Sequence, residues 1–280
     1  MIFTAMNTGR RRRYLEMRDE ADLIPAKIVI PIYKDQLDAC EQISLDQCCK
    51  TLSAWPAVFV KPKSLDTVNL QRDYPSIETK AFDDGYFASL AGYNRLMMSQ
   101  EFYERFADCR YILIYQLDAY VFRDELQQWC RRGYDYIGAP WLLKRKYSYF
   151  PLWLFLRIKT ILRHRELRPF AENRVGNGGL SLRRVASHLE VCKAKKSLIA
   201  RFVERCRLHS EFNEDVFWAT QNPEFRYPDL HEALLFSISE QPLRCLTRAG
   251  GRLPFGCHGW SKPSRIDFWR DKIAMSRTEG

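Results

Sequence analysis

The sequence predicts an α/β fold, in which a mixed, mainly parallel sheet is flanked by helices. Residues 27–33 and 111–115 are two short runs of largely apolar residues. Runs of this kind are typical of strands that are covered on both faces, as in the centre of a parallel sheet. Residues 35–52 and 87–106 instead carry apolar side chains at helical spacing. A chain of 280 residues without a Pro/Gly/Ser-rich linker fits one large domain of this class.

The elements expected in the first half follow from apolar spacing and from turn residues. Residues 1–25 are polar, charged and basic, and we expect a loose lead-in to the domain. Pro31 removes a ladder hydrogen bond near the end of the first strand and turns the chain out of the sheet. Asp83-Asp84-Gly85 is a turn signal whose two acids fit either a metal site or a solvated loop. The expected elements are strand 27–33, helix 35–52, strands 57–61 and 77–82, and helix 87–106.

Residues 110–123 read RYILIYQLDAYVFR and hold the first candidate functional side chain. The strand stops at Gln116-Leu117-Asp118, and apolar character resumes directly afterwards. A carboxylate buried at this point is costly unless a metal ion or a hydrogen-bond network receives it. The carboxyl end of a central strand is also where open α/β sheets bind ligands. Asp118 is therefore either a ligand-binding residue or the start of a turn that leads to the next helix.

The middle of the chain continues this pattern and then departs from it. We expect a helix over 124–131, capped by its first residue, and a strand over 134–137 that leads into Gly138-Ala139-Pro140-Trp141. Trp141 fits either a sugar-stacking ring or a core residue. Residues 144–168 combine Trp, Phe and Leu with flanking Lys and Arg, over an apolar stretch too short to cross a bilayer. This insertion fits an interfacial helix on a membrane surface, or a surface helix packed on the domain or on a second subunit.

Charge and cysteine usage restrict the class of partner. The net charge of +10 suits an anionic partner, such as the phosphates of a nucleotide sugar or a membrane surface. The basic residues show no serial base-stacking pattern, so we expect no nucleic-acid partner. The nine cysteines are odd in number and lack metal-ligand spacing. Residues 1–5 are too short an apolar stretch for a secretory signal, and we expect reduced thiols and a cytoplasmic location.

Three motifs in the second half carry the remaining candidates. Residues 175–183 read VGNGGLSLR, whose glycines permit close approach of a ligand, or form a bulge or hairpin turn. Residues 213–218 read NEDVFW, in which the Asn caps a helix and the two acids favour its first turn. Residues 254–260 read PFGCHGW and place His258 in a glycine-flanked loop. Helices with basic residues toward solvent are expected between the first two motifs, over 183–192 and 195–208.

In this order, YQLDAYVF, DYIGAPW, GNGGLSLR, NEDVFW and PFGCHGW resemble the GT-A glycosyltransferase superfamily. More closely, they are similar to a family of bacterial glycosyltransferase-like proteins, DUF5672. The resemblance implies a GT-A-like, Rossmann-like fold in a single catalytic domain over 26–262, with 144–168 as a basic-apolar insertion and 263–280 as a polar, peripheral tail. It implies a nucleotide-diphosphate sugar as donor, a UDP-sugar first of all, and a hydroxyl of a glycan or lipid-linked glycan as acceptor. Bacterial surface polysaccharide synthesis, on the inner face of the cytoplasmic membrane, is the implied setting.

The resemblance also implies which positions contact the donor. The first strand would end beside the base, the helix over 87–106 would reach the pyrophosphate, and the glycine motif would lie by the donor sugar and the acceptor. The implied donor-binding residues are Pro31, Tyr33, Arg95, Gln116, Asp118, Asn177, Gly178 and Gly179.

The implied chemistry uses a divalent cation and a general base. Asp118 and His258 would bind Mn²⁺ or Mg²⁺, which neutralises the charge of the leaving diphosphate. Asp215, with Glu214 as the alternative, would take the acceptor proton and so favour inversion. For the acids and His258, the helix-capping and structural interpretations given above remain the alternatives.

Gln116 departs from the usual metal motif, which carries two Asp residues around a spacer. This departure leaves room for a site in which basic residues hold the pyrophosphate. It also sustains a second hypothesis, a non-catalytic nucleotide-sugar or membrane-surface binding protein with a degenerate GT-A site. A metal-dependent nucleotidyltransferase would need more carboxylates near Asp118 than the sequence places there.

Overall fold

The computed structural model describes residues 23–142, 175–209 and 212–278, together with positions 150, 151, 154, 155 and 158. The predicted lead-in therefore lies outside the described residues up to residue 22, and so does most of the insertion predicted at 144–168. Within the described part, no helix combines the length and the apolarity needed to cross a membrane.

A six-stranded sheet forms the centre of the molecule. Its strands are β1 (Ile24–Pro31), β2 (Ala57–Pro62), β3 (Glu78–Phe82), β4 (Cys109–Tyr115), β6 (Tyr136–Pro140) and β7 (Val175–Arg184). The order is β3-β2-β1-β4-β7-β6, in which the first four strands pair in parallel and β7 is antiparallel to both of its neighbours. In the described sheet β7 alone is reversed, which confirms the predicted mixed, mainly parallel sheet.

The chain changes the side on which it adds strands between β1 and β4. It builds β2 and β3 on one side of β1 and then crosses to place β4 on the other side. Neighbouring parallel strands whose connections leave in opposite directions open a crevice at their carboxyl ends, and open α/β sheets bind ligands there. The apolar run at 111–115 is this central strand, and its side chains are almost completely buried.

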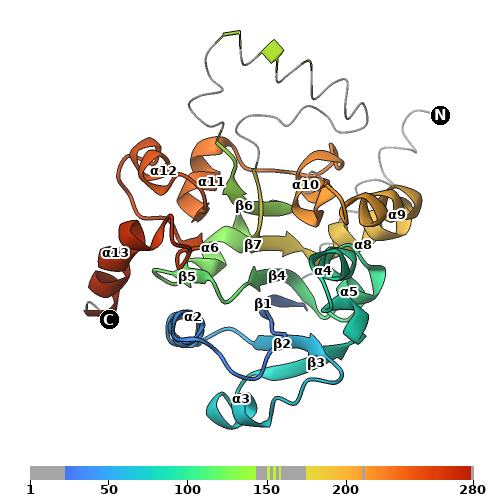
Figure 1. Cartoon of the computed structure of the whole chain (residues 1–280), viewed down its shortest axis with the longest axis horizontal. Coiled ribbons are helices and arrows are strands. Elements are labelled where there is room, and N and C mark those ends of the chain that lie inside the picture. Colours follow the sequence, from blue (N-terminus) through green and yellow to red (C-terminus); the bar gives the residue numbers. More distant parts are fainter. Residues whose placement is uncertain are drawn as a thin grey trace, which may run out of the picture.

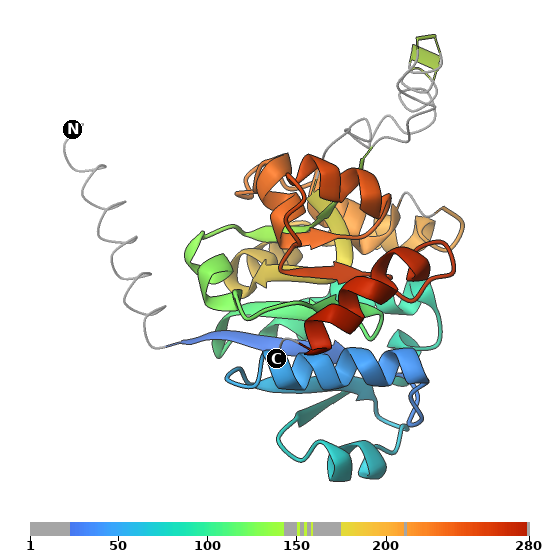
Figure 2. The same ribbon diagram turned by 90° about the vertical axis from the view of Figure 1, so that its left-hand side faces the viewer.

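Helices cover both faces of the sheet, and a small second sheet lies beside it. The helices are α2 (Ala39–Thr51), α3 (Val68–Asp73), the 3₁₀ helix η1 (Asp84–Tyr86), α4 (Leu90–Met97), α5 (Gln100–Glu104), α6 (Leu126–Arg131), α8 (Val185–Ala194), α9 (Lys196–Arg205), α10 (Glu214–Thr220), α11 (Leu230–Phe236), α12 (Pro242–Arg248) and α13 (Ile266–Thr278). Figures 1 and 2 show α2 and α13 on one side, and α4, α5, α8 and α9 together on the other. The second sheet has the order β5-β9-β8 and consists of β5 (Ala119–Val121), β8 (Ser237–Ile238) and β9 (Gly256–His258).

Capping side chains decide where several helices begin. The Asp38 carboxylate accepts from the Glu41 N–H at 3.0 Å and the Glu41 carboxylate accepts from the Asp38 N–H at 2.9 Å, a capping box that starts α2. The prediction of one helix over 87–106 is wrong, because Ser99 starts a second helix within it. The Ser99 hydroxyl accepts from the Phe102 N–H at 3.1 Å, so α4 and α5 are separate.

The C-terminal residues form α13, which packs against the domain. Trp269 is fully buried and Ile273 is 5% exposed. The Trp269 ring lies 5.7 Å from the Phe122 ring, within a second apolar cluster that includes residues of β9 and α12. The expectation of a polar, peripheral tail over 263–280 is therefore wrong for this helix. Trp269 and Ile273 are four positions apart and so lie on one helical face.

Candidate active site

A cleft of about 510 Å³ opens at the carboxyl ends of β1 and β4. Residues 31–33 line it where β1 ends, and residues 116–118 line it where β4 ends. Tyr33 is 66% exposed, so it is not a core residue. Four residues predicted to bind the donor share this cleft: Pro31, Tyr33, Gln116 and Asp118. The other lining residues are Ile32, Lys34, Leu37, Asp38, Glu41, Phe87, Ser89, Leu90, Tyr93, Leu117 and Ser261.

The second sheet brings His258 to Asp118. β5 and β9 are antiparallel, and their register places Ala119 opposite His258. His258 Nε2 lies 2.9 Å from Asp118 Oδ1 and 3.2 Å from Gln116 Oε1. His258 Nδ1 lies 3.4 Å from the Ser239 hydroxyl. The two predicted cation ligands, which are far apart in the sequence, thus meet at the edge of the cleft.

The loop after β9 adds Lys262 to the same point. The N–H groups of Gly259 and Trp260 donate to the Asp118 carbonyl oxygen at 2.8 and 3.2 Å, which holds this loop against the end of β4. Lys262 Nζ lies 3.6 Å from Asp118 Oδ2. Lys262 was not among the predicted site residues, because nothing in the sequence distinguishes it from the other lysines.

Asp118 is ionised at neutral pH. Burial acts to raise its pKa, but the hydrogen bond and charge of His258 and the charge of Lys262 together lower the pKa below the usual aspartate value. The cleft therefore holds a carboxylate that is ready to accept a cation.

Tyr93 of α4 orients Gln116, and Arg95 of the same helix lies elsewhere. Gln116 Nε2 donates to the Tyr93 hydroxyl at 3.1 Å, which leaves the amide oxygen of Gln116 facing His258. The Arg95 guanidinium stacks over the Tyr86 ring at 4.7 Å and lines a separate groove between α4 and α9. Arg95 therefore does not line the cleft that holds Pro31, Tyr33, Gln116 and Asp118. Two residues along a helix are about 200° apart, so Tyr93 and Arg95 face different sides.

The glycine motif at 175–183 is a strand. It forms most of β7, which pairs with β4 and, across register shifts opposite Gly138 and Ala139, with β6. The motif is therefore a strand and not a hairpin turn, and its pairing with β6 is irregular. Asn177 folds back onto this strand, where its Oδ1 accepts from the Gly179 N–H at 3.2 Å.

Gly178 and Gly179 contact two different parts of the site. A Cβ atom at Gly179 would overlap the His258 imidazole, and a Cβ atom at Gly178 would overlap the Glu214 carboxylate. Real Cβ atoms do not make contacts this short. β7 therefore lies between the cation ligands and the acidic motif, and it touches both.

The nucleotide binding predicted from the sequence should be weakened about 10- to 100-fold by Gly179→Ala, because the new methyl group displaces His258. Gly178→Ala is the matched variant, since it displaces Glu214 instead and should lower turnover without changing nucleotide affinity. Isothermal titration with a nucleoside diphosphate and Mn²⁺ measures the nucleotide affinity of both variants. Equal losses of affinity in the two variants would contradict this division of the site.

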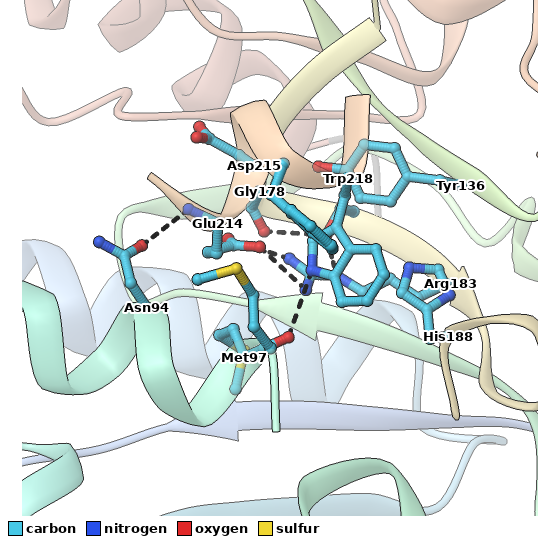
Figure 3. A network of polar contacts seen from close by, with 12 residues as sticks. Asn94, Met97, Tyr136, Gly178, Arg183, His188, Glu214, Asp215 and Trp218 are labelled. Atoms are coloured by element: carbon cyan, nitrogen blue, oxygen red, sulfur yellow. Dashed lines mark hydrogen bonds and ion pairs between the residues drawn. The ribbon is translucent and has the colours of Figure 1, made fainter. Parts of the chain in front are cut away.

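Asn94 of α4 fixes the start of α10 (Figure 3). Its Oδ1 accepts from the Glu214 N–H at 3.0 Å, and its Nδ2 donates to Asn213 Oδ1 at 3.0 Å. Asn213 occupies the predicted N-cap position of α10, but its side chain makes no capping hydrogen bond. A buried Asn inside an apolar helix was the one sequence signal for this contact.

The two acids of the motif point in different directions (Figure 3). Glu214 is 4% exposed and pairs with the Arg183 guanidinium, whereas the half-buried Asp215 carboxylate points away from Arg183. Burial and the neighbouring charge of Glu214 raise the pKa of Asp215 to about 7. A carboxylate with such a pKa is suited to accept a proton near neutral pH. Glu214, the alternative base, is held in the core by Arg183.

Arg183 is the largest departure from the sequence analysis. It was expected at the start of a helix with basic residues toward solvent. The structure places it in β7, where it is completely buried. Charged side chains are rarely buried unless they are paired, and Glu214 supplies the partner.

The donor atoms of the cleft fit a cation that is shared with a ligand. Within the described residues there is no group of three or more His, Cys, Asp or Glu side chains that could hold a metal ion. The cleft offers the His258 imidazole, and the Asp118 carboxylate and the Gln116 amide oxygen both lie close to its Nε2 atom. This set is too small for an all-protein site. It suits a cation whose remaining positions are filled by phosphate oxygens and water.

One family model matches this chain. It is described as Protein of unknown function (DUF5672) and covers residues 76–258, a range that includes Asp118, Asp215 and His258. A comparison with curated proteins found no match.

Solved structures of two glycosyltransferases resemble this chain. The galactosyltransferase LgtC in complex with donor and acceptor sugar analogues is 13% identical, with 90% of this chain and 95% of LgtC covered and a TM-score of 0.57. An active-site mutant of LgtC is 16% identical, with the same coverage and a TM-score of 0.54. The mannosyltransferase Ktr4p from S. cerevisiae in complex with GDP is 10% identical, with 63% of this chain and 62% of Ktr4p covered and a TM-score of 0.40. This chain thus spans less than two thirds of Ktr4p. The likeness to LgtC confirms the GT-A-like architecture.

Proposed function

Because this chain belongs to the DUF5672 family and folds like LgtC, we propose that it is a glycosyltransferase. The observation that carries the proposal is the meeting of Asp118, His258 and Lys262 at a cleft on the carboxyl ends of β1 and β4. Groups of this kind bind a diphosphate and its counter-ion. Asp215, a carboxylate suited to proton transfer, lies on the far side of Gly178 from these groups.

The donor in this proposal is a nucleotide-diphosphate sugar, and a UDP-sugar in particular. Tyr33 and Pro31 at the rim of the cleft would contact the base. Lys262 and Lys34 would lie by the diphosphate, whose negative charge they offset. The net charge of +10 agrees with an anionic ligand of this class.

Asp118 and His258 would hold a divalent cation, Mn²⁺ or Mg²⁺, with Gln116 adding an amide oxygen. Such a cation, when bound, stabilises the charge that develops on the leaving diphosphate. Lys262 places a positive charge next to Asp118, so a side chain of the protein would also offset the negative charge of the leaving diphosphate.

Asp215 would act as the general base. It would take the proton of the acceptor hydroxyl while the acceptor oxygen bonds to the anomeric carbon and the bond to the diphosphate oxygen breaks. This direct displacement inverts the configuration at the anomeric carbon. Base catalysis with a pKa of about 7 is active at neutral pH and above, where the carboxyl is ionised.

The acceptor in this proposal is a glycan or lipid-linked glycan of a bacterial surface polysaccharide, and the enzyme works at the inner face of the cytoplasmic membrane. Support comes from the described positions of the basic insertion, where Phe150, Phe155 and Ile158 are 76%, 60% and 48% exposed. Apolar side chains exposed among Lys and Arg suit an interfacial segment. Co-sedimentation with anionic vesicles measures this contact, and absence of binding would remove it.

A panel of UDP- and GDP-sugars, tested with and without Mn²⁺, examines the function itself. We expect at least one nucleotide sugar to raise the melting temperature and to be slowly hydrolysed, and a chelator to suppress both effects. If no nucleotide or nucleotide sugar binds at millimolar concentration, the proposal fails. Binding without hydrolysis or transfer to any acceptor would instead identify the non-catalytic binding protein.

A further inference from the structure

A buried pair of charges lies directly beside the acidic motif. Arg183 of β7 and Glu214 of α10 form two contacts, from Nη1 to Oε2 and from Nη2 to Oε1, each of 3.2 Å (Figure 3). Their side chains are 0% and 6% exposed. Desolvating two charges is costly, and apolar residues of similar volume stabilise a core at least as well. The pair therefore calls for a role other than stability.

Arg183 makes two hydrogen bonds besides its contacts with Glu214. Its Nε donates to the Ser181 hydroxyl at 3.0 Å, and its Nη1 donates to the Tyr103 hydroxyl at 3.2 Å. The Ser181 hydroxyl donates in turn to the Gly178 carbonyl oxygen at 2.9 Å. The guanidinium is thus a fixed point of β7, oriented by groups from two elements.

Glu214 is held with equal restriction at the first position of α10. Its N–H donates to Asn94 and its carboxylate is bound by Arg183. The carboxylate lies so close to Gly178 that a Cβ atom at that position would overlap it. These contacts fix the rotation of the first helical turn. Asp215, the next residue, thereby points its carboxylate away from Arg183, and its Cβ atom lies 3.4 Å from the position that a Cβ atom at Gly178 would take.

We infer that Arg183 and Glu214 are positioning residues for Asp215, which they hold by fixing the first turn of α10 against β7. This inference rests on the proposed function for the role of Asp215 as base. Neither residue lines the cleft described above, so neither is expected to contact the donor.

The two charges act on Asp215 in opposite directions. Glu214 raises the pKa of Asp215 and Arg183 lowers it. Tyr136 of β6 is a further titratable group that interacts with Asp215. Asn94 of α4 and the Phe202 ring of α9 also pack against α10.

The test is a direct titration of Asp215 by ¹³C NMR on free protein carrying labelled aspartate, with Asp215→Asn to assign the signal. Glu214→Gln should lower the midpoint and Arg183→Met should raise it, each by about 1 to 3 pH units. The matched controls are Glu101→Gln and Arg105→Met, which change an exposed ion pair at the end of α5. Neither variant should shift the midpoint of Asp215. A structural role alone would not produce shifts of opposite sign.

A double variant keeps the test decisive if a single variant fails to fold. Arg183→Met/Glu214→Leu removes both charges and leaves no unpaired group, so we expect it to fold. Its turnover should fall by about 10- to 100-fold through kcat, while the melting shift caused by the donor stays unchanged. A folded double variant with wild-type turnover would overturn the inference. Because the titration of the single variants needs no substrate, it tests the inference even if the wild-type protein transfers no sugar.

Discussion

Replacing Asp215 by Asn should abolish sugar transfer and leave donor binding intact. The amide cannot accept the acceptor proton, and loss of a general base costs about 10²- to 10⁴-fold in rate. Asp215 lies outside the donor cleft, so the affinity for the nucleotide sugar should not change. Turnover at saturating donor, together with a titration of donor binding, measures both quantities. Transfer at more than a tenth of the wild-type rate would remove Asp215 from the mechanism.

The same variant should be more stable than the wild-type protein at pH 8. The folded-state pKa of Asp215, about 7, lies above that of an unfolded aspartate, so its contribution to stability is complete at low pH and is lost as the pH rises through 7. Asn resembles the protonated form at every pH. We expect a gain of about 1 kcal/mol at pH 8, reduced by solvent screening of the partly exposed carboxyl, and therefore a melting temperature higher by about 2–4 °C.

Thermal unfolding at pH 4 and at pH 8 checks the sign, because the gain should vanish at the lower pH. Asp229→Asn is the control, since Asp229 caps α11 by accepting from the Glu232 N–H, and Asn caps a helix equally well. A gain of the same size in both variants would show that the effect does not come from the titration of Asp215.

Asp118→Asn should remove most of the activity together with the cation dependence. The substitution keeps the shape of the side chain but takes away the one carboxylate that faces both His258 and Lys262. Metal stabilisation of a leaving group contributes several kcal/mol, so we expect a loss of about 10³-fold in kcat/KM. The melting shift that Mn²⁺ and a nucleoside diphosphate produce together should disappear.

Asp83→Asn is the matched control for this variant. Asp83 belongs to the pair of adjacent acids in the loop before η1, where it accepts from the Gly85 N–H, and it does not line the cleft. It should keep wild-type activity and a wild-type response to Mn²⁺. If Asp118→Asn retained the combined melting shift, the cation would have to bind elsewhere.

The sheet was readable from the sequence because its strands are covered on both faces. Continuous apolar runs such as 111–115 have no amphipathic alternation, and the end of such a run marks the ligand-binding edge of the sheet. Asp118 was accessible to this argument. The break in the predicted helix over 87–106 was harder to predict. The apolar stripe continues across Ser99, although the helix ends before it and a new helix begins after it.

The candidate site was only partly accessible, because its partners come from distant segments. The meeting of Asp118 with His258 was implied by the resemblance and depends on the pairing of β5 with β9. Arg183 was assigned to solvent because charged residues are mostly exposed, and nothing local announces that Glu214 will pair with it. Arg95 was selected because it lies off the apolar stripe of its helix, whereas Tyr93, which belongs to that stripe, lines the cleft.

The two adjacent glycines of β7 have a consequence for how the gene tolerates insertions. Successive residues of a strand project to opposite faces, so Gly178 and Gly179 serve the acidic motif and the cation ligands respectively. Adding or deleting one residue just before them would exchange the faces. An added residue would then be driven into Glu214, whereas a deletion would drive Leu180 into His258. Length changes here should therefore be tolerated far less than substitutions at the rim of the cleft.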